Sequence, residues 1–180
     1  MLPGFEESTG IKVVTSSGAS EGNWPKTIRC QLAHGATADV AILSREGLNI
    51  LNEDGQIKQH SDAGLATTPL AAAVRPSTAK TDIATDTSFR SALIDAELIA
   101  MPGSTSGIFI RDKVFPKLNL PKNVTFTLVA RGTESAENFR RGKSNLAICP
   151  SSELTNLPGI EMAGLLRKDL HLVQTFTARL

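Results

Sequence analysis

The chain has 180 residues, of which 41% are hydrophobic and 21% charged, which fits an ordinary globular protein of one domain or two small lobes. Its 19 basic and 18 acidic residues give a net charge of +1 without a basic stripe, and only 4% of residues are aromatic, so we expect no nucleic-acid partner. No apolar run is long enough to span a bilayer, and residues 1–7 lack the basic and apolar regions of a signal peptide.

Cysteine and histidine are too sparse to suggest a metal site. Cys30 falls within a predicted helix and Cys149 at the end of a predicted strand, positions typical of small buried side chains. A disulfide between them stays possible, because sequence spacing does not decide pairing. The three histidines show no ligand spacing with one another or with cysteine. We therefore expect no metal ion and no other cofactor.

The first part of the chain predicts a strand, a helix and a second strand. Residues 11–15 are β-branched and extended, and residues 39–43 form the next apolar strand. Between them, residues 24–34 carry an apolar stripe on a helix that stops near Gly35. A unit of this kind normally belongs to a parallel sheet and binds ligands at the carboxyl ends of its strands.

The rest of the chain continues to alternate strands and helices. Residues 65–74 predict two short strands joined at Pro69, because proline is excluded from a central ladder. Further helices are predicted at 88–95, 108–118, 135–141 and from Pro150, and Asp86 or Thr87 is expected to cap the first of them. Further strands are predicted at 98–101, 124–129, 145–149, 160–165 and 172–176. We expect the last two strands to return to the first lobe. This alternation predicts the α/β class.

Three loops between a predicted strand and a predicted helix are rich in hydroxyl side chains. They are Ser16–Ser20, Ser104–Gly107 and Pro150–Ser152. A helix N-terminus leaves N–H groups unpaired and carries partial positive charge, so nearby hydroxyls add neutral donors for an anion. Serine and glycine are also common in ordinary turns and caps, so one such loop alone is a weak signal. Together the three loops indicate a candidate anion-binding site.

The order of these motifs resembles a known family. Ser20, Gly22, Pro25, Ile28, Leu32, Gly35 and Ala38-Asp39-Val40 are spaced as in the serine loop and GxxADV block of type II periplasmic binding proteins. The segments Phe5–Val13, Leu65–Val74, Ser106–Leu118 and Pro158–Ile160 resemble other parts of that family, in the same order. The most similar branch contains molybdate-binding proteins and the related aconitate isomerases.

The resemblance implies an α/β fold with two lobes, mostly parallel sheets, and a small anion held between the lobes. We expect residues 1–68 to begin lobe one, residues 69–150 to form lobe two, and residues 151–180 to return through the hinge and complete lobe one. Carried over by position, the ligand-binding candidates are Ser17, Ser20, Ser104, Thr105, Ser106, Gly107 and Ser151, with Ser44 and Arg45 at the same end of the sheet. The family is periplasmic or extracellular, whereas a chain without a signal peptide would otherwise be cytoplasmic.

The sequence departs from the family pattern at both ends. Family members begin with a strand and a serine loop before the helix that ends near Gly10, and they continue with a helical segment beyond the Phe176 region. We therefore expect a shortened first lobe with an exposed sheet edge. Such an edge invites pairing with another chain, which predicts a homo-oligomer.

The sequence motifs are compatible with two functions. The first is binding of a small anion, either an oxyanion such as molybdate or a small polycarboxylate, and a tricarboxylate would recruit arginines such as Arg45, Arg75 or Arg131. The alternative is an isomerase of the aconitate type, which needs a base for proton transfer at carbon. Glu21, Glu134 and Glu153 are possible bases, and Glu21 beside the first loop is our first choice although an exposed carboxylate at a helix start is also common. The residues identify no transporter partner.

Overall fold

The computed structural model describes residues 2–58, 61–76 and 81–179. Its strands are β1 (Ala41–Ser44), β2 (Ala63–Val74), β3 (Leu98–Pro102), β4 (Thr125–Val129), β5 (Leu146–Pro150), β6 (Glu161–Leu165) and β7 (Val173–Arg179). Its α-helices are α1 (Leu2–Thr9), α2 (Ile28–Ala33), α3 (Arg45–Glu53), α4 (Asp86–Ala96), α5 (Thr105–Phe109), α6 (Phe115–Leu118) and α7 (Gly132–Arg140). A π-helical turn, Ile110–Val114, joins α5 to α6, and 3₁₀ turns cover Ser151–Glu153 and Lys168–Leu170.

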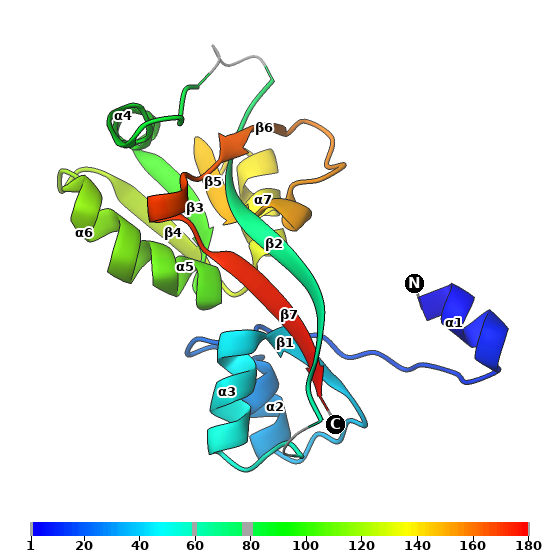
Figure 1. Ribbon diagram of the computed structural model, residues 1–180. Helices are drawn as coiled ribbons and strands as arrows, with labels where there is room; N and C mark the ends of the chain where they lie inside the picture. The colour runs from blue at the N-terminus through cyan, green and yellow to red at the C-terminus, as the bar shows by residue number, and fades with distance from the viewer. Residues whose placement is uncertain (1, 59–60, 77–80, 180) are drawn as a thin grey trace.

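The long strand β2 links two parts of the molecule. The strand order is β1-β7-β2-β5-β3-β4, with β6 also paired to β2. Up to Pro69, β2 pairs with β7, and from Leu70 onward it pairs with β5 and β6. We call α2 with the preceding residues 16–27, β1, α3, β7 and the first half of β2 lobe one, and the second half of β2 with the elements from α4 to β6 lobe two. In Figure 1, β2 and β7 run side by side from one lobe to the other.

The predicted break at Pro69 is wrong, because β2 is a single strand of 12 residues. Pro69 is the last residue of β2 paired with β7, opposite Val173, and Leu70 is the first paired with β5. The missing proline N–H therefore falls where β2 changes partners, at the ends of both ladders. A proline is tolerated there although it would disrupt the middle of either ladder.

The expectation of mostly parallel sheets holds only for part of lobe two. The pairs of β3 with β4 and with β5 are parallel, but all pairs made by β1, β2, β6 and β7 are antiparallel. The predicted parallel unit at the start of the chain is wrong, because residues 11–15 form no strand. Val14 is 88% exposed, and the Val13 N–H donates to Glu6 Oε1 (2.6 Å) rather than to a neighbouring strand. Figure 1 shows this segment and α1 extending away from both lobes.

Several element boundaries also differ from the sequence prediction. Helix α2 begins only after Thr27, whose side chain accepts from the Cys30 N–H (3.1 Å) and caps the helix. The cap of α4 is Thr85 instead of Asp86 or Thr87, because Thr85 and Ser88 form a reciprocal capping box. The predicted helix from Pro150 is only a 3₁₀ turn, and β6 pairs with the lobe-two half of β2 instead of returning to lobe one.

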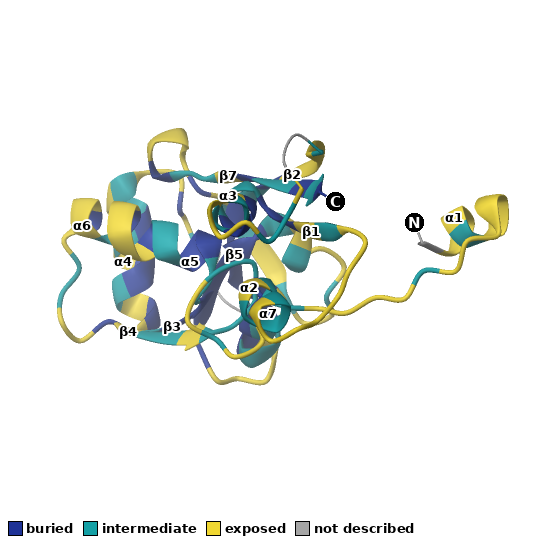
Figure 2. Cartoon of the chain, turned by 90° about the horizontal axis from the view of Figure 1, so that it is seen from below, coloured by how far each residue is buried: buried dark blue, intermediate teal, exposed yellow. Residues whose placement is uncertain are grey.

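Lobe two holds most of the hydrophobic core. Its larger cluster packs α4 and the α5–α6 helix against one face of the sheet, and the smaller packs α7 around Phe139 against the other face. Lobe one has a small core of Leu43, Leu48 and Leu51 between β1 and α3. Figure 2 shows the buried residues gathered in β3, β5 and α5, whereas α1 is largely exposed. Lobe two therefore has the larger core on which a site can be built.

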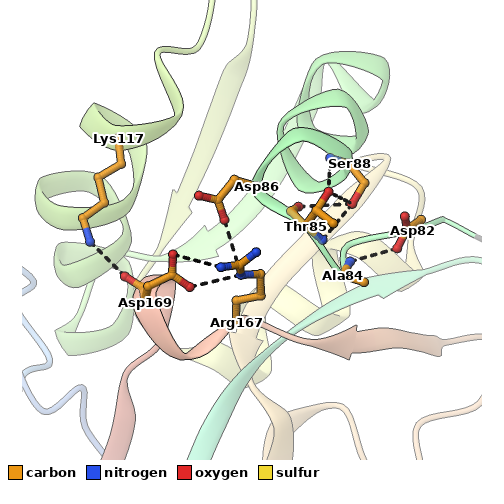
Figure 3. Close-up of polar contacts among 8 residues, drawn as sticks. All are labelled: Asp82, Ala84, Thr85, Asp86, Ser88, Lys117, Arg167 and Asp169. Atoms are coloured by element: carbon orange, nitrogen blue, oxygen red, sulfur yellow. Dashed lines mark hydrogen bonds and ion pairs between the residues drawn. The ribbon is translucent and has the colours of Figure 1, made fainter.

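A polar cluster fixes the segment that leads into β7. Arg167 Nε lies 3.5 Å from Asp86 Oδ1 at the start of α4 and 3.1 Å from Asp169 Oδ1. Lys117 Nζ of α6 donates to the Asp169 carbonyl (2.8 Å). Figure 3 shows Arg167 between the two carboxylates, with Lys117 reaching Asp169 from the other side. These contacts attach residues 167–169 to lobe two before β7 crosses to lobe one.

Candidate ligand-binding site between the lobes

A buried hydroxyl pair joins the two lobes. Ser44 ends β1 and is fully buried, and its Oγ lies 2.7 Å from Oγ1 of Thr105, the first residue of α5. The same Ser44 Oγ accepts from the Gly47 N–H (3.2 Å) and so caps α3. The Ser44 N–H in turn donates to Ser20 Oγ (3.1 Å). Hydroxyls from two of the predicted loop regions therefore meet the end of β1 in one cluster, Ser20–Ser44–Thr105.

One member of this hydroxyl cluster, Ser20, lines a cavity between the lobes. The cavity has a volume of about 290 Å³, and its walls are Ser20, Glu21, Gly22, Asn23, Thr27, Arg29 and Ile50 from lobe one and Gly103, Ile108 and Arg111 from lobe two. A second cavity of about 280 Å³ shares Asn23, Gly103, Ile108 and Arg111 with it, and adds Trp24, Met101, Gly107 and Leu128. The two cavities thus meet along a common wall that contains Arg111.

Two glycines allow the lobes to approach closely beside these cavities. Trp24 Nε1 donates to the Gly103 carbonyl (3.4 Å), and a Cβ on Gly103 would lie 2.9 Å from the indole ring. Gly22 has φ of +100°, and a Cβ there would lie 2.5 Å from the Gly103 carbonyl oxygen. Any side chain at Gly22 or Gly103 would therefore push the loop of lobe one away from lobe two.

The N-terminus of α5 presents backbone donors beside the hydroxyl cluster. Ser104 has extended dihedrals and makes no side-chain cap bond, so its hydroxyl does not occupy the first N–H groups of the helix. Ser106 is 1% exposed, and a Cβ on Gly107 would collide with the Pro102 carbonyl oxygen, which explains why glycine stands there. The helix continues through the π-helical turn to Leu118, and its dipole places partial positive charge at Thr105.

A second polar group lies at the hinge. Thr68 of β2 is 5% exposed; its Oγ1 is 3.3 Å from Ser151 Oγ and accepts from the Ser152 N–H (3.2 Å). Gln174 of β7 is directly opposite Thr68 in the ladder, so both side chains lie on the same face of the sheet. Gln174 is 4% exposed, and its Oε1 has no hydrogen-bond partner within residues 2–58, 61–76 and 81–179.

The sequence prediction missed Gln174. A single glutamine in a strand belongs to no motif, turn or cap, so only its burial and its position opposite Thr68 draw attention to it. Phe176, two residues further along β7, is opposite Ser44. Ser44, Thr68 and Gln174 therefore lie on the same face of the sheet. From this face Ser44 contacts Thr105 and Thr68 contacts Ser151, both in lobe two.

Some predicted ligand residues lie away from the cavities. Ser17 is exposed, and its carbonyl accepts from Gln31 Nε2 (3.2 Å). Arg45 lies next to Ser44 in sequence, but its guanidinium binds Asp62 (2.6 Å). Among the predicted residues, the structure brings together Ser20, Ser44 and the segment 104–107, with Ser151 at the hinge. Their contact with a ligand stays a prediction.

The other two arginines considered for a carboxylate also have local partners. Arg75 Nη2 donates to the carbonyls of Phe139 (3.3 Å) and Ser144 (2.8 Å), so it caps the end of α7. Arg131 pairs with Glu134 (3.3 Å). Neither lines either inter-lobe cavity, whereas Arg111 lines both and Arg29 lines the first.

The three candidate bases have different surroundings. Glu21 is half-buried and lines the first cavity. Glu134 accepts from the Ala130 N–H (3.1 Å) as well as pairing with Arg131. Glu153 is half-buried beside Gly132; burial raises its pKa, and the charge of Arg131 opposes this rise. Glu21 alone of the three contributes to the wall of an inter-lobe cavity.

The part of the chain that the structure describes has neither a metal-binding cluster nor a membrane-spanning helix. Within it, no three or more His, Cys, Asp or Glu side chains are arranged to hold a metal ion. Cys30 and Cys149 are both free thiols, and burial raises the pKa of Cys149. None of the described helices is long and apolar enough to cross a membrane.

Sequence comparisons identify relatives along the whole chain. Residues 1–180 match the model of the family described as bacterial extracellular solute-binding protein. The chain is 31% identical over 169 residues to an aconitate isomerase from Pseudomonas sp, an alignment that covers 92% of this chain and 64% of that protein. The chain thus spans slightly less than two thirds of the length of this curated relative.

Structural comparisons show the same fold at low sequence identity. The periplasmic molybdate-binding protein of Azotobacter vinelandii matches with a TM-score of 0.76 and 16% identity, covering 99% of this chain and 77% of that chain. The L-phospholactate-bound protein PEB3 matches with a TM-score of 0.68 and 13% identity, covering 99% and 78%. The α/β fold of the type II periplasmic binding proteins, expected from the sequence motifs, is confirmed.

Proposed function

Because this chain belongs to the bacterial extracellular solute-binding protein family, we propose that it binds a small anion in the cleft between its lobes. The observation that carries this proposal is the cluster of Ser20 and Ser44 from lobe one with Thr105 at the start of α5 in lobe two. Hydroxyls and unpaired helix N–H groups are neutral donors that suit an anion. A ligand that contacts both lobes would also stabilise the arrangement in which they meet.

Gln174 extends this donor set toward the hinge. The unpartnered atom of Gln174 is Oε1, an acceptor that an anion cannot satisfy, so it is the Nε2 group of the same amide that can donate to an anion. We propose that the Gln174 amide, next to Thr68 and Ser151, contacts the same anion or a part of it. The molybdate and L-phospholactate bound by two proteins of the same fold are both anions, which supports this class of ligand.

Thermal unfolding with candidate anions tests the proposal. A ligand that binds only the native state raises the unfolding temperature according to its concentration relative to Kd. We expect an upward shift with at least one of molybdate, sulfate, citrate and trans-aconitate. The shift should be reduced in Ser20→Ala and preserved in the control Ser8→Ala, an exposed serine of α1. Absence of a shift with every anion would refute the proposal.

An isomerase is the second candidate, and the 31% identity to an aconitate isomerase favours it. Moving a double bond along a carbon skeleton requires a base that removes a proton from carbon and an acid that returns one. Glu21 is the candidate base because it lines the cavity that contains Ser20. Interconversion of cis- and trans-aconitate, followed by proton NMR, should occur in the parent and be lost in Glu21→Gln while trans-aconitate still binds.

We also propose two partners for the chain. The family is an extracellular one, and a solute-binding role implies a membrane transporter as recipient of the ligand. The second partner is another copy of the chain. Within the described strands, β1 pairs only with β7, so its outer edge is open to pairing. Light scattering across a range of concentrations should show a dimer or larger oligomer, and a monomer throughout would refute this part.

A further inference from the structure

The cavities beside the hydroxyl cluster carry more than the proposed oxyanion donors. Their walls include Ile50, Met101, Ile108 and Leu128, which give apolar surface to a carbon skeleton. A bare tetrahedral oxyanion has no use for such surface. The same walls also contain two arginines that the sequence analysis did not select, Arg29 from α2 and Arg111 from the π-helical turn.

Arg111 is placed for contact with a ligand. It lines both cavities, one helical turn beyond Ile108. A helix rises about 1.5 Å per residue, so Arg111 lies about 9 Å along the axis from Thr105 at the hydroxyl cluster. The turn Ile110–Val114 is π-helical, a geometry that is uncommon in helices and often found at functional sites.

Both arginines keep donors for a further carboxylate. Arg111 uses Nε and Nη2 to bind its sequence neighbour Asp112 (2.6 and 3.0 Å), and Arg29 binds Asp54 with the same two atoms. A guanidinium has five N–H donors, so Nη1 and one N–H of Nη2 remain in each case. The side chains of Arg29 and Arg111 are 58% and 57% exposed, and ion pairs in such positions are weak enough to be exchanged for a ligand.

We infer that the ligand is an organic acid with two or more carboxylates, and that Arg111, with Arg29 opposite, binds the carboxylate that lies farthest from the hydroxyl cluster. This inference rests on the proposed anion-binding function. One carboxylate binds the Ser20 hydroxyl, the carbon chain lies against Ile108, and the remote carboxylate reaches the guanidinium. Glu21 is the negative group in the same cavity, and it stands beside the carbon skeleton in this arrangement.

Calorimetric titration of the full chain with citrate, trans-aconitate, molybdate and sulfate tests the inference. We expect Arg111→Gln to weaken citrate or trans-aconitate binding by about ten-fold or more, the usual effect of losing a charge-assisted hydrogen bond. Binding of molybdate or sulfate should change by less than about two-fold, because the lost charge is remote and screened. Arg140→Gln is the matched control, since Arg140 makes the same two-atom pair with Glu137 on α7.

The outcomes separate this inference from the proposed function. Selective loss of tricarboxylate binding in Arg111→Gln, with Arg140→Gln unchanged, supports it. A parent protein that binds molybdate or sulfate but neither tricarboxylate overturns the inference and leaves the anion-binding proposal standing. Equal tricarboxylate affinities in both variants overturn the role of Arg111. A parent that binds none of the four anions overturns both proposals.

Discussion

The hydroxyl pair Ser44–Thr105 should couple the stabilities of the two lobes. Ser44→Ala removes the cap of α3, which costs about 1 kcal/mol, and leaves the buried Thr105 hydroxyl without its partner, which costs about 1–3 kcal/mol. We expect a total loss of about 2–4 kcal/mol in the free energy of unfolding. Thr105→Val keeps the cap of α3 but leaves the Ser44 hydroxyl without one of its two partners. Its free energy of unfolding should therefore fall by about 1–2 kcal/mol.

The double variant is the decisive measurement. With both hydroxyls removed no buried partner is orphaned, so the double variant should lose little more than Ser44→Ala alone. Urea unfolding of the four proteins should give a coupling energy of about 1 kcal/mol or more. Additivity within about 0.5 kcal/mol would refute the role of this pair in joining the lobes. An unchanged slope of free energy against urea would confirm that the native and unfolded states remain comparable.

Three further changes have outcomes fixed by the structure. Gly107→Ala should cost at least about 2 kcal/mol in urea unfolding, because the new Cβ collides with the Pro102 carbonyl; a smaller loss would contradict this packing. Gly22→Ala should weaken anion binding in calorimetry by holding the loop off Gly103, and unchanged affinity would contradict the close approach. Burial raises the pKa of Glu153, so the native state binds the carboxyl proton more tightly than the unfolded state does. The native state therefore loses stability as pH rises from about 4.3, the ordinary glutamate pKa, through the raised native pKa. Glu153→Gln should therefore be more stable than the parent at pH 7 but not at pH 3.5. Urea unfolding in which the variant gains stability at pH 3.5 but not at pH 7 would refute this.

Local sequence patterns determined much of the architecture. The alternation of apolar strands with capped helices predicted the α/β class, and the order of the serine loop and the GxxADV block predicted the family that the whole-chain match confirms. Most strands and helices of lobe two lie within a few residues of their predicted ranges. These features depend on backbone preferences and on the spacing of apolar side chains. Both are properties of residues that are close together in the sequence, so they can be read without the tertiary structure. The division into residues 1–68, 69–150 and 151–180 stays a prediction.

Contacts between distant segments were decided only by the tertiary structure. Ser44 and Thr105 are 61 residues apart, and their bond depends on how β1 meets α5 across the lobes. Residues 11–15 have a strand-like sequence but form no ladder, because a strand needs a neighbour as well as β-branched side chains. Gln174 and Arg111 are ordinary residues in their local sequence. Gln174 belongs to the candidate site because the strand register places it opposite Thr68. Arg111 belongs to it because its π-helical turn lies beside a cavity. Neither the register nor the place of that turn follows from the spacing of adjacent residues.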